Sequence, residues 1–252
     1  MVASSAAAEP PNEGPEAQWM TGPAEPRLGV EELHVWQADL RTVEDPAERT
    51  LSVQEHVRAA AIVDPPARAL WVRSRGTLRA LLGRYLQLPP AALQIVSDER
   101  GKPSLLAADG AETHGRSPFF SLSHSGHLAL YGFATAGAIG VDVQLARRLD
   151  RGSNKQRSPH DHIVLARRAF GEREAQRLHA LPVSFREAEF LRLWTRYEAE
   201  LKCHGVGIGG ECAWLGVDRW VFDLDLERRE QLQAAAAVAT TRPPRALQLW
   251  RV

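Results

Sequence analysis

The sequence predicts an α+β fold made of two similar lobes. Three observations support this prediction. Strand-like and helix-like segments follow one another in the order strand, helices, hairpin, helices, strands. The second half of the chain loosely repeats the first. The composition, with 44% hydrophobic and 25% charged residues among 252, is ordinary for a globular protein with a buried core. We expect an N-terminal lobe over residues 28–136 and a C-terminal lobe over residues 137–252.

A leader precedes the first lobe. Residues 1–27 are rich in Ala, Pro, Glu and Gly, and they contain no basic stretch that leads into an apolar one. A secretion signal needs both features, and a segment of this composition buries too little apolar surface to fold by itself. We therefore predict a disordered leader, with order beginning near Leu28.

The first half contains strand-like and helix-like segments in turn. Residues 32–40 alternate well enough for a strand. Residues 46–63 favour a helix that ends before Asp64 and the two prolines after it. Residues 67–86 repeat apolar side chains at helical spacing, and residues 93–106 indicate two short strands around a polar turn.

The second half begins within a predicted hairpin. The apolar runs 128–134 and 138–143 are expected to be neighbouring strands joined by a short turn. Residues 145–160 are basic and polar without a period, which indicates an exposed loop. Helices are expected over 162–180 and 184–204, the second closed by a glycine. The tail supplies further strands, within 214–226, 232–240 and 245–252.

Charge and cysteine content exclude several classes of protein. Lys plus Arg and Asp plus Glu both number 31, so the formal net charge is zero, which argues against a bulk nucleic-acid or membrane-surface binder. No apolar run approaches the roughly 18–20 residues of a membrane span. Cys203 and Cys212 form neither a metal-site spacing nor a disulfide framework. We expect a cytoplasmic protein with no nucleic-acid or membrane partner.

Asp142 lies in the middle of an apolar run, where an uncompensated carboxylate is costly. Alternate side chains of a strand share a face, so Asp142 and Gln144 point to the same side, with Cα atoms about 6–7 Å apart. Two oxygens at that distance can converge on a hard cation such as Mg²⁺. For one aspartate alone, a polar strand face that meets water is the simpler explanation.

Glu198 and Lys202 are expected on one face of the helix over 184–204, together with Trp194 and Leu201. This face would present a carboxylate and an ammonium to a site. The alternative is a structural (i, i+4) ion pair worth a few tenths of a kcal/mol.

Positive residues accompany these acids. Arg75 and Arg79 are four residues apart and share a helix face, Lys102 lies in the turn RGKPS, and His124 lies in the serine-rich turn LSHSG. Free backbone N–H groups and hydroxyls in such a turn can bind phosphate oxygens. Solvated arginines and an ordinary turn remain the alternative.

The four motifs, taken in order, resemble those of a known family. They are GKP, FSLSHSG, IGVDV and, about fifty residues later, WTRYEAELKCHGVG. In this order they resemble the 4′-phosphopantetheinyl transferases, and more closely the surfactin-synthetase-type class, whose two lobes are related by a pseudo-twofold axis. The resemblance covers roughly residues 50–210. It implies a Mg²⁺-dependent monomer, with Mn²⁺ as an alternative ion. Such an enzyme transfers the phosphopantetheine arm of coenzyme A to a serine of an acyl or peptidyl carrier protein and releases adenosine 3′,5′-bisphosphate.

The resemblance also implies roles for individual residues. Asp142, Glu198 and, at a position where the family usually has an acid, Gln144 would hold the metal. Glu198, or a metal-bound water held by it, would take the serine proton, and Lys202 would assist with Asp142 in catalysis. The assignments to coenzyme A are Arg75 and His124 at the 3′-phosphate, Arg79 as a helper there, Gly101, Lys102 and Pro103 along the adenine with Lys102 also near phosphate, Ser123 and Lys202 at the pyrophosphate, and Glu174 near the site.

Two positions depart from the family pattern. Gln144 offers a carbonyl oxygen but no formal charge, and Tyr197 stands where the family has a lysine. These changes keep a second hypothesis open, a non-catalytic relative that binds coenzyme A or a carrier protein as a regulatory module. A third hypothesis is another Mg²⁺-dependent nucleotide or phosphate enzyme on a convergent scaffold, although the common GxxxxGK[ST] and GxGxxG signatures are missing.

The basic loop over residues 145–160 is a candidate docking surface. Carrier proteins of this family are small, acidic helical bundles, so a basic loop would steer them. A solvated loop without a partner is the alternative. Its basic residues are Arg147, Arg148, Arg151, Lys155 and Arg157.

Overall fold

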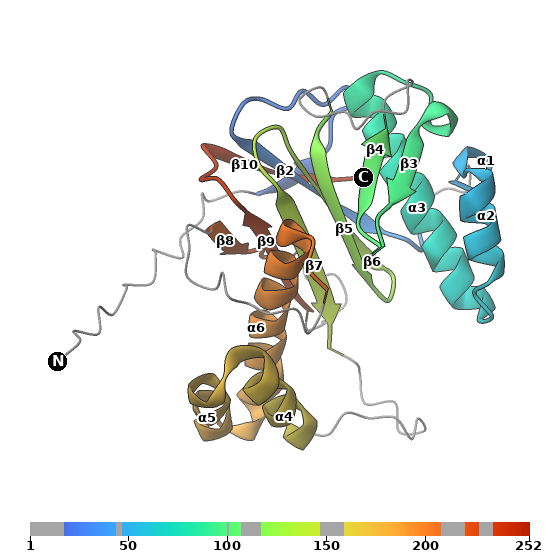
Figure 1. Cartoon of the computed structure of the whole chain (residues 1–252). Helices are drawn as coiled ribbons and strands as arrows, with labels where there is room; N and C mark the ends of the chain where they lie inside the picture. Colours follow the sequence, from blue (N-terminus) through green and yellow to red (C-terminus); the bar gives the residue numbers. More distant parts are fainter. Residues whose placement is uncertain are drawn as a thin grey trace.

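A computed structural model shows how these segments fold (Figure 1). The predicted mixed α+β architecture is confirmed. The structure describes residues 18–43, 47–99, 101–106, 117–146, 159–207, 220–226 and 234–252. None of the helices in these ranges combines the length and the apolar composition needed to cross a bilayer.

The larger sheet contains, among the described residues, five strands in the order β1-β10-β2-β6-β5. The strands β1, β10 and β2 are parallel, and β2, β6 and β5 are antiparallel. The bounds are β1 (Trp19–Thr21), β2 (Glu32–Asp39), β5 (Phe119–Ser125), β6 (Leu128–Ala134) and β10 (Ala246–Arg251). Strand β10 comes from the end of the chain but lies beside β2, so both halves of the sequence contribute to one sheet. The division into lobes at residues 136 and 137 stays a prediction.

Strand β1 corrects the predicted start of order. It lies inside the leader expected over residues 1–27, of which 1–17 fall outside the described residues. Trp19 pairs with Leu249 of β10 in parallel register, and the backbone N–H of Gly22 donates to Arg251. The edge of β10 therefore supplies hydrogen-bond partners for the backbone of β1. The composition of the leader gave no sign of this pairing.

A smaller sheet has, within the described ranges, the strand order β7-β9-β8 (Ile139–Leu145, Ala234–Thr240 and Trp220–Asp223). The predicted hairpin between residues 128–134 and 138–143 is therefore wrong, because β6 pairs with β5 and β7 pairs with β9. Both runs are strands, but the chain leaves one sheet and enters the other between them. Their apolar content fits a hairpin and a pair of buried strands in different sheets equally well. The pattern alone therefore could not distinguish these two arrangements.

Side chains, and not a backbone ladder, join the two sheets between β5 and β7. The backbone N–H groups of Val141, Val143 and Leu145 donate to serine hydroxyls of β5 at 3.1, 3.4 and 3.1 Å. The accepting residues are Ser121, Ser123 and Ser125. The serines that were expected in a turn lie in strand β5, and their alternation places β7, and with it Asp142, against β5.

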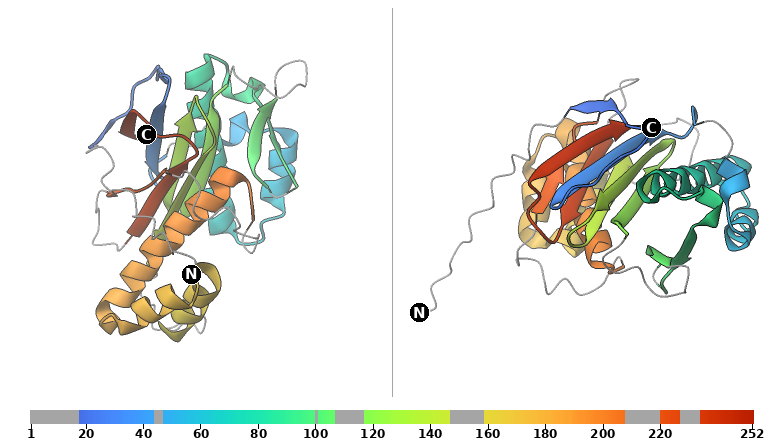
Figure 2. Two further views of the ribbon diagram at one scale, coloured as in Figure 1. Left: turned by 60° about the vertical axis from the view of Figure 1, so that its left-hand side comes forward. Right: turned by 90° about the horizontal axis from the view of Figure 1, so that it is seen from above.

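Helices cover the two sheets on separate sides (Figures 1 and 2). Helix α3 (Pro65–Leu86) begins at Asp64, whose side chain accepts from Ala67 N at 3.0 Å, and it packs Leu78, Leu81 and Leu82 on the larger sheet. Helix α6 (Val183–His204) packs on β7 and β9 and ends at Gly205, whose φ of 68° closes the helix. A hairpin of β3 (Gln94–Ser97) and β4 (Pro103–Leu106) lies beside α3, after the short 3₁₀ turn Pro90–Ala92.

Two predicted helices are each divided in two. Residues 46–63 form α1 (Ala47–Thr50) and α2 (Val53–Ala60), because Ser52 caps a new helix. Residues 162–180 form α4 (Pro159–Phe170) and α5 (Glu172–Ala180), separated by Gly171 with a φ of 89°. A glycine adopts this conformation without strain, so the chain turns there.

Candidate active site

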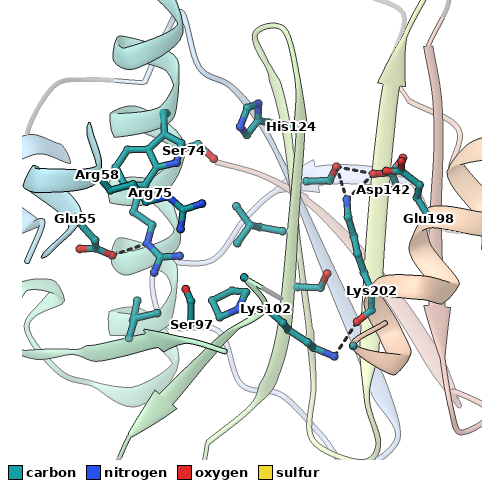
Figure 3. A pocket seen from close by; sticks show the side chains of 18 of the residues that line it. Glu55, Arg58, Ser74, Arg75, Ser97, Lys102, His124, Asp142, Glu198 and Lys202 are labelled. Atoms are coloured by element: carbon teal, nitrogen blue, oxygen red, sulfur yellow. Dashed lines mark hydrogen bonds and ion pairs between the residues drawn. The ribbon is translucent and has the colours of Figure 1, made fainter. Parts of the chain in front are cut away.

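The described residues enclose a cavity of about 650 Å³ between the two halves of the fold. Helices α2 and α3 and the β3–β4 hairpin form one wall, β5 forms the centre, and β7 with the end of α6 forms the other wall. Figure 3 shows Glu55, Arg58 and Arg75 on the first wall and Asp142, Glu198 and Lys202 on the second. The lining includes Arg75, Gly101, Lys102, Pro103, Ser123, His124, Asp142, Gln144, Glu198 and Lys202. The structure therefore brings together ten of the residues singled out in the sequence.

Asp142 is fully buried at the centre of the second wall. Its Oδ1 accepts hydrogen bonds from Ser123 Oγ at 2.7 Å and from Lys202 Nζ at 2.5 Å. Lys202 also donates to Ser123 Oγ at 2.9 Å. The strands β5 and β7 and the helix α6 thus meet at one carboxylate, which explains why an acid interrupts the apolar run.

Glu198 lies one helical turn before Lys202 and faces the same centre (Figure 3). Its Oε1 accepts a hydrogen bond from Trp194 Nε1 at 2.9 Å. Burial and the negative charge of Asp142 raise the pKa of Glu198 to about 7, although Lys202 and the Trp194 hydrogen bond oppose this shift. Two carboxylates that face each other in a partly buried site favour a proton or a cation between them.

The oxygen donors here fit a hard divalent cation such as Mg²⁺. Within the described ranges no cluster of three or more His, Cys, Asp or Glu side chains could hold a metal. Gln144 also lines the cavity, and its Nε2 donates to Asp142 Oδ2 at 3.2 Å. Rotating this amide by half a turn would present its carbonyl oxygen instead. The carboxylates of Asp142 and Glu198 line the same cavity, so the site fits the ion.

The side chains expected to bind coenzyme A differ in their charge and in the hydrogen bonds that they already make within the protein. Burial, together with the charge of Lys202, lowers the pKa of His124, so this imidazole is mainly neutral at pH 7. Lys102 lines the cavity, but its Nζ donates to the carbonyl oxygens of Lys202 at 2.7 Å and Cys203 at 3.0 Å. It therefore closes the C-terminal end of α6 from the opposite wall. Burial lowers the pKa of this ammonium.

Two predicted residues do not line the cavity. Arg79 is fully buried, and its guanidinium donates to Glu55 Oε2 at 2.7 Å and to the carbonyl oxygens of Pro90 and Leu93. Glu174 lies on α5 and pairs with Arg177 outside the cavity. For Arg79 the sequence could not show this, because helical spacing gives the face of an arginine but not the depth of its head group. Glu174 was assigned from the resemblance alone.

Tyr197 does not stand in for the missing lysine. Its ring packs edge-on against Phe170, with centroids 5.6 Å apart, and lies 6.0 Å from Trp194. It belongs to an aromatic cluster between α4 and α6 and is not part of the cavity wall.

Sequence reasoning missed Glu55, which lines the first wall. Burial opposes its ionisation, but the Ser52 N–H, Arg75 and Arg79 outweigh burial and lower the pKa of Glu55. The motif Ser-x-x-Glu at residues 52–55 is a capping box, and this signal could have identified the start of α2. Its second role, as a partner of two arginines, depends on tertiary contacts.

Comparisons with known proteins agree with this geometry. A family model described as the 4′-phosphopantetheinyl transferase superfamily matches residues 138–250. The chain is 34% identical over 182 residues to slr0495 of Synechocystis sp., a protein that carries the name of a 4′-phosphopantetheinyl transferase. It is also 34% identical over 193 residues to the 4′-phosphopantetheinyl transferase HetI of Nostoc sp..

These alignments cover 72% and 75% of this chain. They span 66% of slr0495, just under two thirds, and 76% of HetI. A human relative, L-aminoadipate-semialdehyde dehydrogenase-phosphopantetheinyl transferase, is 25% identical over 181 residues, which cover 71% of this chain and 56% of that protein. The chain belongs to the 4′-phosphopantetheinyl transferase superfamily.

Proposed function

We propose that this protein transfers the 4′-phosphopantetheine arm of coenzyme A to a serine of an apo acyl or peptidyl carrier protein, in a Mg²⁺-dependent reaction. The observation that supports this most is the meeting of Asp142 and Glu198, one from a strand and one from a helix, beside Lys202 and Ser123 in one cavity. Family membership supplies the reaction class. The proposed working form is a cytoplasmic monomer.

The reaction joins the serine oxygen of the carrier to the β-phosphorus of coenzyme A. The bond from that phosphorus to the leaving adenosine 3′,5′-bisphosphate breaks, and the serine proton must be removed. Glu198 is the proposed base, because its carboxylate lies in the cavity beside Asp142 and Lys202. Asp142, Glu198 and Gln144 would hold Mg²⁺, which supplies Lewis-acid stabilisation of the diphosphate when bound.

The remaining residues bind and orient the substrate. Lys202 and Ser123 would contact the diphosphate, since the ammonium and the hydroxyl lie beside Asp142. Arg75 and His124 would hold the 3′-phosphate, and the turn from Gly101 to Pro103 would line the adenine. These contacts would place the β-phosphorus near Glu198, which is the positioning that phosphoryl transfer requires.

A carrier protein must also dock beside the cavity. The basic residues proposed for this role, at positions 147–157, lie outside the described residues. Their part in docking remains a prediction. Reversing their charge should raise the KM for the carrier protein and leave the KM for coenzyme A unchanged.

An assay of carrier modification tests the proposed function. An apo carrier protein is incubated with the protein, coenzyme A and Mg²⁺, and its intact mass is measured. We expect the mass of one phosphopantetheine arm to be added, and Asp142→Ala and Glu198→Ala to abolish the addition. Binding of coenzyme A without modification of any carrier protein would favour the non-catalytic module, which the uncharged Gln144 keeps open. If the protein neither binds coenzyme A nor modifies a carrier protein, both the transferase and the non-catalytic module are overturned.

A further inference from the structure

Three hydrogen bonds converge on the carboxylate of Glu55 in the first wall of the cavity. Arg75 Nε donates to Oε1 at 2.5 Å, Arg79 Nε donates to Oε2 at 2.7 Å, and the backbone N–H of Ser52 donates to Oε2 at 2.8 Å. Glu55 side-chain exposure is only 7%. The carboxylate therefore links the start of α2 to two successive turns of α3.

Arg79 fixes this carboxylate from behind. Its side chain has no exposed surface, and its Nη1 donates to the carbonyl oxygens of Pro90 at 2.8 Å and Leu93 at 3.1 Å. Because two backbone carbonyl groups hold this guanidinium, it cannot move when a ligand binds. Arg79 therefore keeps the Glu55 carboxylate in one position.

Arg75 differs from Arg79 because it lines the cavity. Within the described part of the chain, the guanidinium of Arg75 pairs with Glu55 through Nε. A guanidinium bound at Nε keeps its terminal pair, Nη1 and Nη2, available for a second partner. That pair matches two oxygens of one phosphate group in a fork.

The charges of this cluster leave one positive charge for a ligand. Glu55 contributes one negative charge, and Arg75 and Arg79 contribute one positive charge each. A simple charge argument makes Glu55 unfavourable for phosphate binding, because it cancels an arginine. Its buried contacts suggest the opposite effect, since it holds the orientation of Arg75.

We propose that Glu55 is a positioning residue that orients Arg75, so that the terminal nitrogens of this arginine receive the 3′-phosphate of coenzyme A. This inference rests on the proposed function and adds α2 to the substrate site. It predicts that Glu55 determines how strongly the protein prefers coenzyme A to dephospho-coenzyme A, which lacks that phosphate.

The test measures the dissociation constants of both ligands by calorimetry in several variants. Glu55→Gln adds net positive charge, so charge alone predicts tighter coenzyme A binding, whereas loss of orientation predicts weaker binding. We expect the preference for coenzyme A to fall by about tenfold, the scale of one charge-assisted hydrogen bond. The affinity for dephospho-coenzyme A should not change.

A second variant covers the case in which Glu55→Gln fails to fold with Arg79 left unpaired. Glu55→Gln/Arg79→Met keeps the net charge of the wild type and removes the buried cation. It should show the same fall in preference, with Arg75→Lys giving a similar fall. Combining Arg75→Lys with the double variant should add little further, because both act through one guanidinium. Glu172→Gln, which removes an exposed carboxylate on α5, should leave the preference unchanged.

The outcomes separate this inference from the proposed function. A wild-type protein that binds neither ligand, or binds both equally, would overturn the proposed placement of the 3′-phosphate and this inference with it. A wild-type preference that survives in the charge-matched double variant would overturn the role of Glu55 alone. Equal weakening for both ligands would show that Glu55 only stabilises the fold.

Discussion

The ammonium of Lys202 lies 2.5 Å from Oδ1 of Asp142, a carboxylate with no exposed surface. The pair joins α6 to β7 at the centre of the cavity. A buried carboxylate without this partner would be strongly unfavourable, so Lys202 has a structural role as well as the proposed catalytic one.

Replacing Lys202 by methionine should therefore destabilise the fold. Breaking a fully buried pair costs about 3–5 kcal/mol, but the Lys202 side chain is 32% exposed, and water reduces the loss to about 1–3 kcal/mol. Urea unfolding measures the change in free energy. Lys202→Arg, which keeps the charge, is the control and should lose less. Equal stability of Lys202→Met and the wild type would contradict this explanation of the pair.

Mg²⁺ affinity should rise with pH through about 7. Below its pKa of about 7 Glu198 carries a proton, which must leave before the carboxylate can bind a cation. Between pH 6 and pH 8 we expect the dissociation constant to fall by about tenfold. Calorimetry in two buffers of different ionisation enthalpy also measures the released proton. Glu198→Gln should bind Mg²⁺ weakly at both pH values, and an unchanged pH dependence in that variant would assign the proton to another group.

Without Mg²⁺ the same shift affects stability in the opposite direction. The folded-state pKa of Glu198 lies above the ordinary value of 4.5, so between these two values the folded protein holds a proton that the unfolded chain has lost. This contribution to stability is fully present below pH 4.5 and is lost as the pH rises through about 7. Glu198→Gln should flatten the pH dependence of the unfolding free energy in this range. A profile that stays as steep as in the wild type would contradict the assignment.

Gln144→Glu should tighten Mg²⁺ binding, because a third carboxylate adds negative charge to the oxygen donors. The Mg²⁺ concentration for half-maximal carrier modification measures this. Gln144→Ala serves as the matched variant and should need more Mg²⁺ than the wild type. An unchanged requirement in both would show that residue 144 takes no part in holding the ion.

Gly140→Ala should separate α6 from β7. A Cβ atom at Gly140 would lie 1.9 Å from the carbonyl oxygen of Ala199 and 2.4 Å from the nitrogen of Cys203, which are helix backbone atoms that cannot turn aside. Overpacking of this kind costs about 3 kcal/mol, and it displaces Glu198 and Lys202 together. We expect lower thermal stability and loss of carrier modification.

Gly207→Ala provides a matched comparison. It also lies at the cavity wall, but a Cβ there would meet no atom within 4 Å among the described residues. It should retain stability and activity. If both alanine variants behaved like the wild type, the close packing of α6 on β7 would not control the site.

Much of this fold and site could be predicted from the sequence, for identifiable reasons. The helices ending at Leu86 and His204 show helical spacing and clear end signals, and the ends agree with the structure. Asp142, Glu198 and Lys202 lie in motifs whose order carries the resemblance. The helix ends and these motifs can all be recognised from residues that are close together in the sequence.

The remainder depends on contacts between distant parts of the chain. The pairing of β7 with β9 and the position of β1 beside β10 leave no trace in local alternation. Arg75 and Arg79 have the same spacing signal, yet one lines the cavity and the other is buried behind Glu55. Only tertiary packing distinguishes them.

The hydroxyl of Ser123 has already used its full bonding capacity. It gives its one proton to Asp142, and its two lone pairs receive the N–H of Val143 and the ammonium of Lys202. A diphosphate oxygen is an acceptor, so it can bind this hydroxyl only by taking the proton that Ser123 now donates to Asp142. A contact between the substrate and Ser123 therefore requires the hydrogen bond from Ser123 to Asp142 to break, which leaves Lys202 as the remaining hydrogen-bond donor to Asp142 Oδ1 among the described residues.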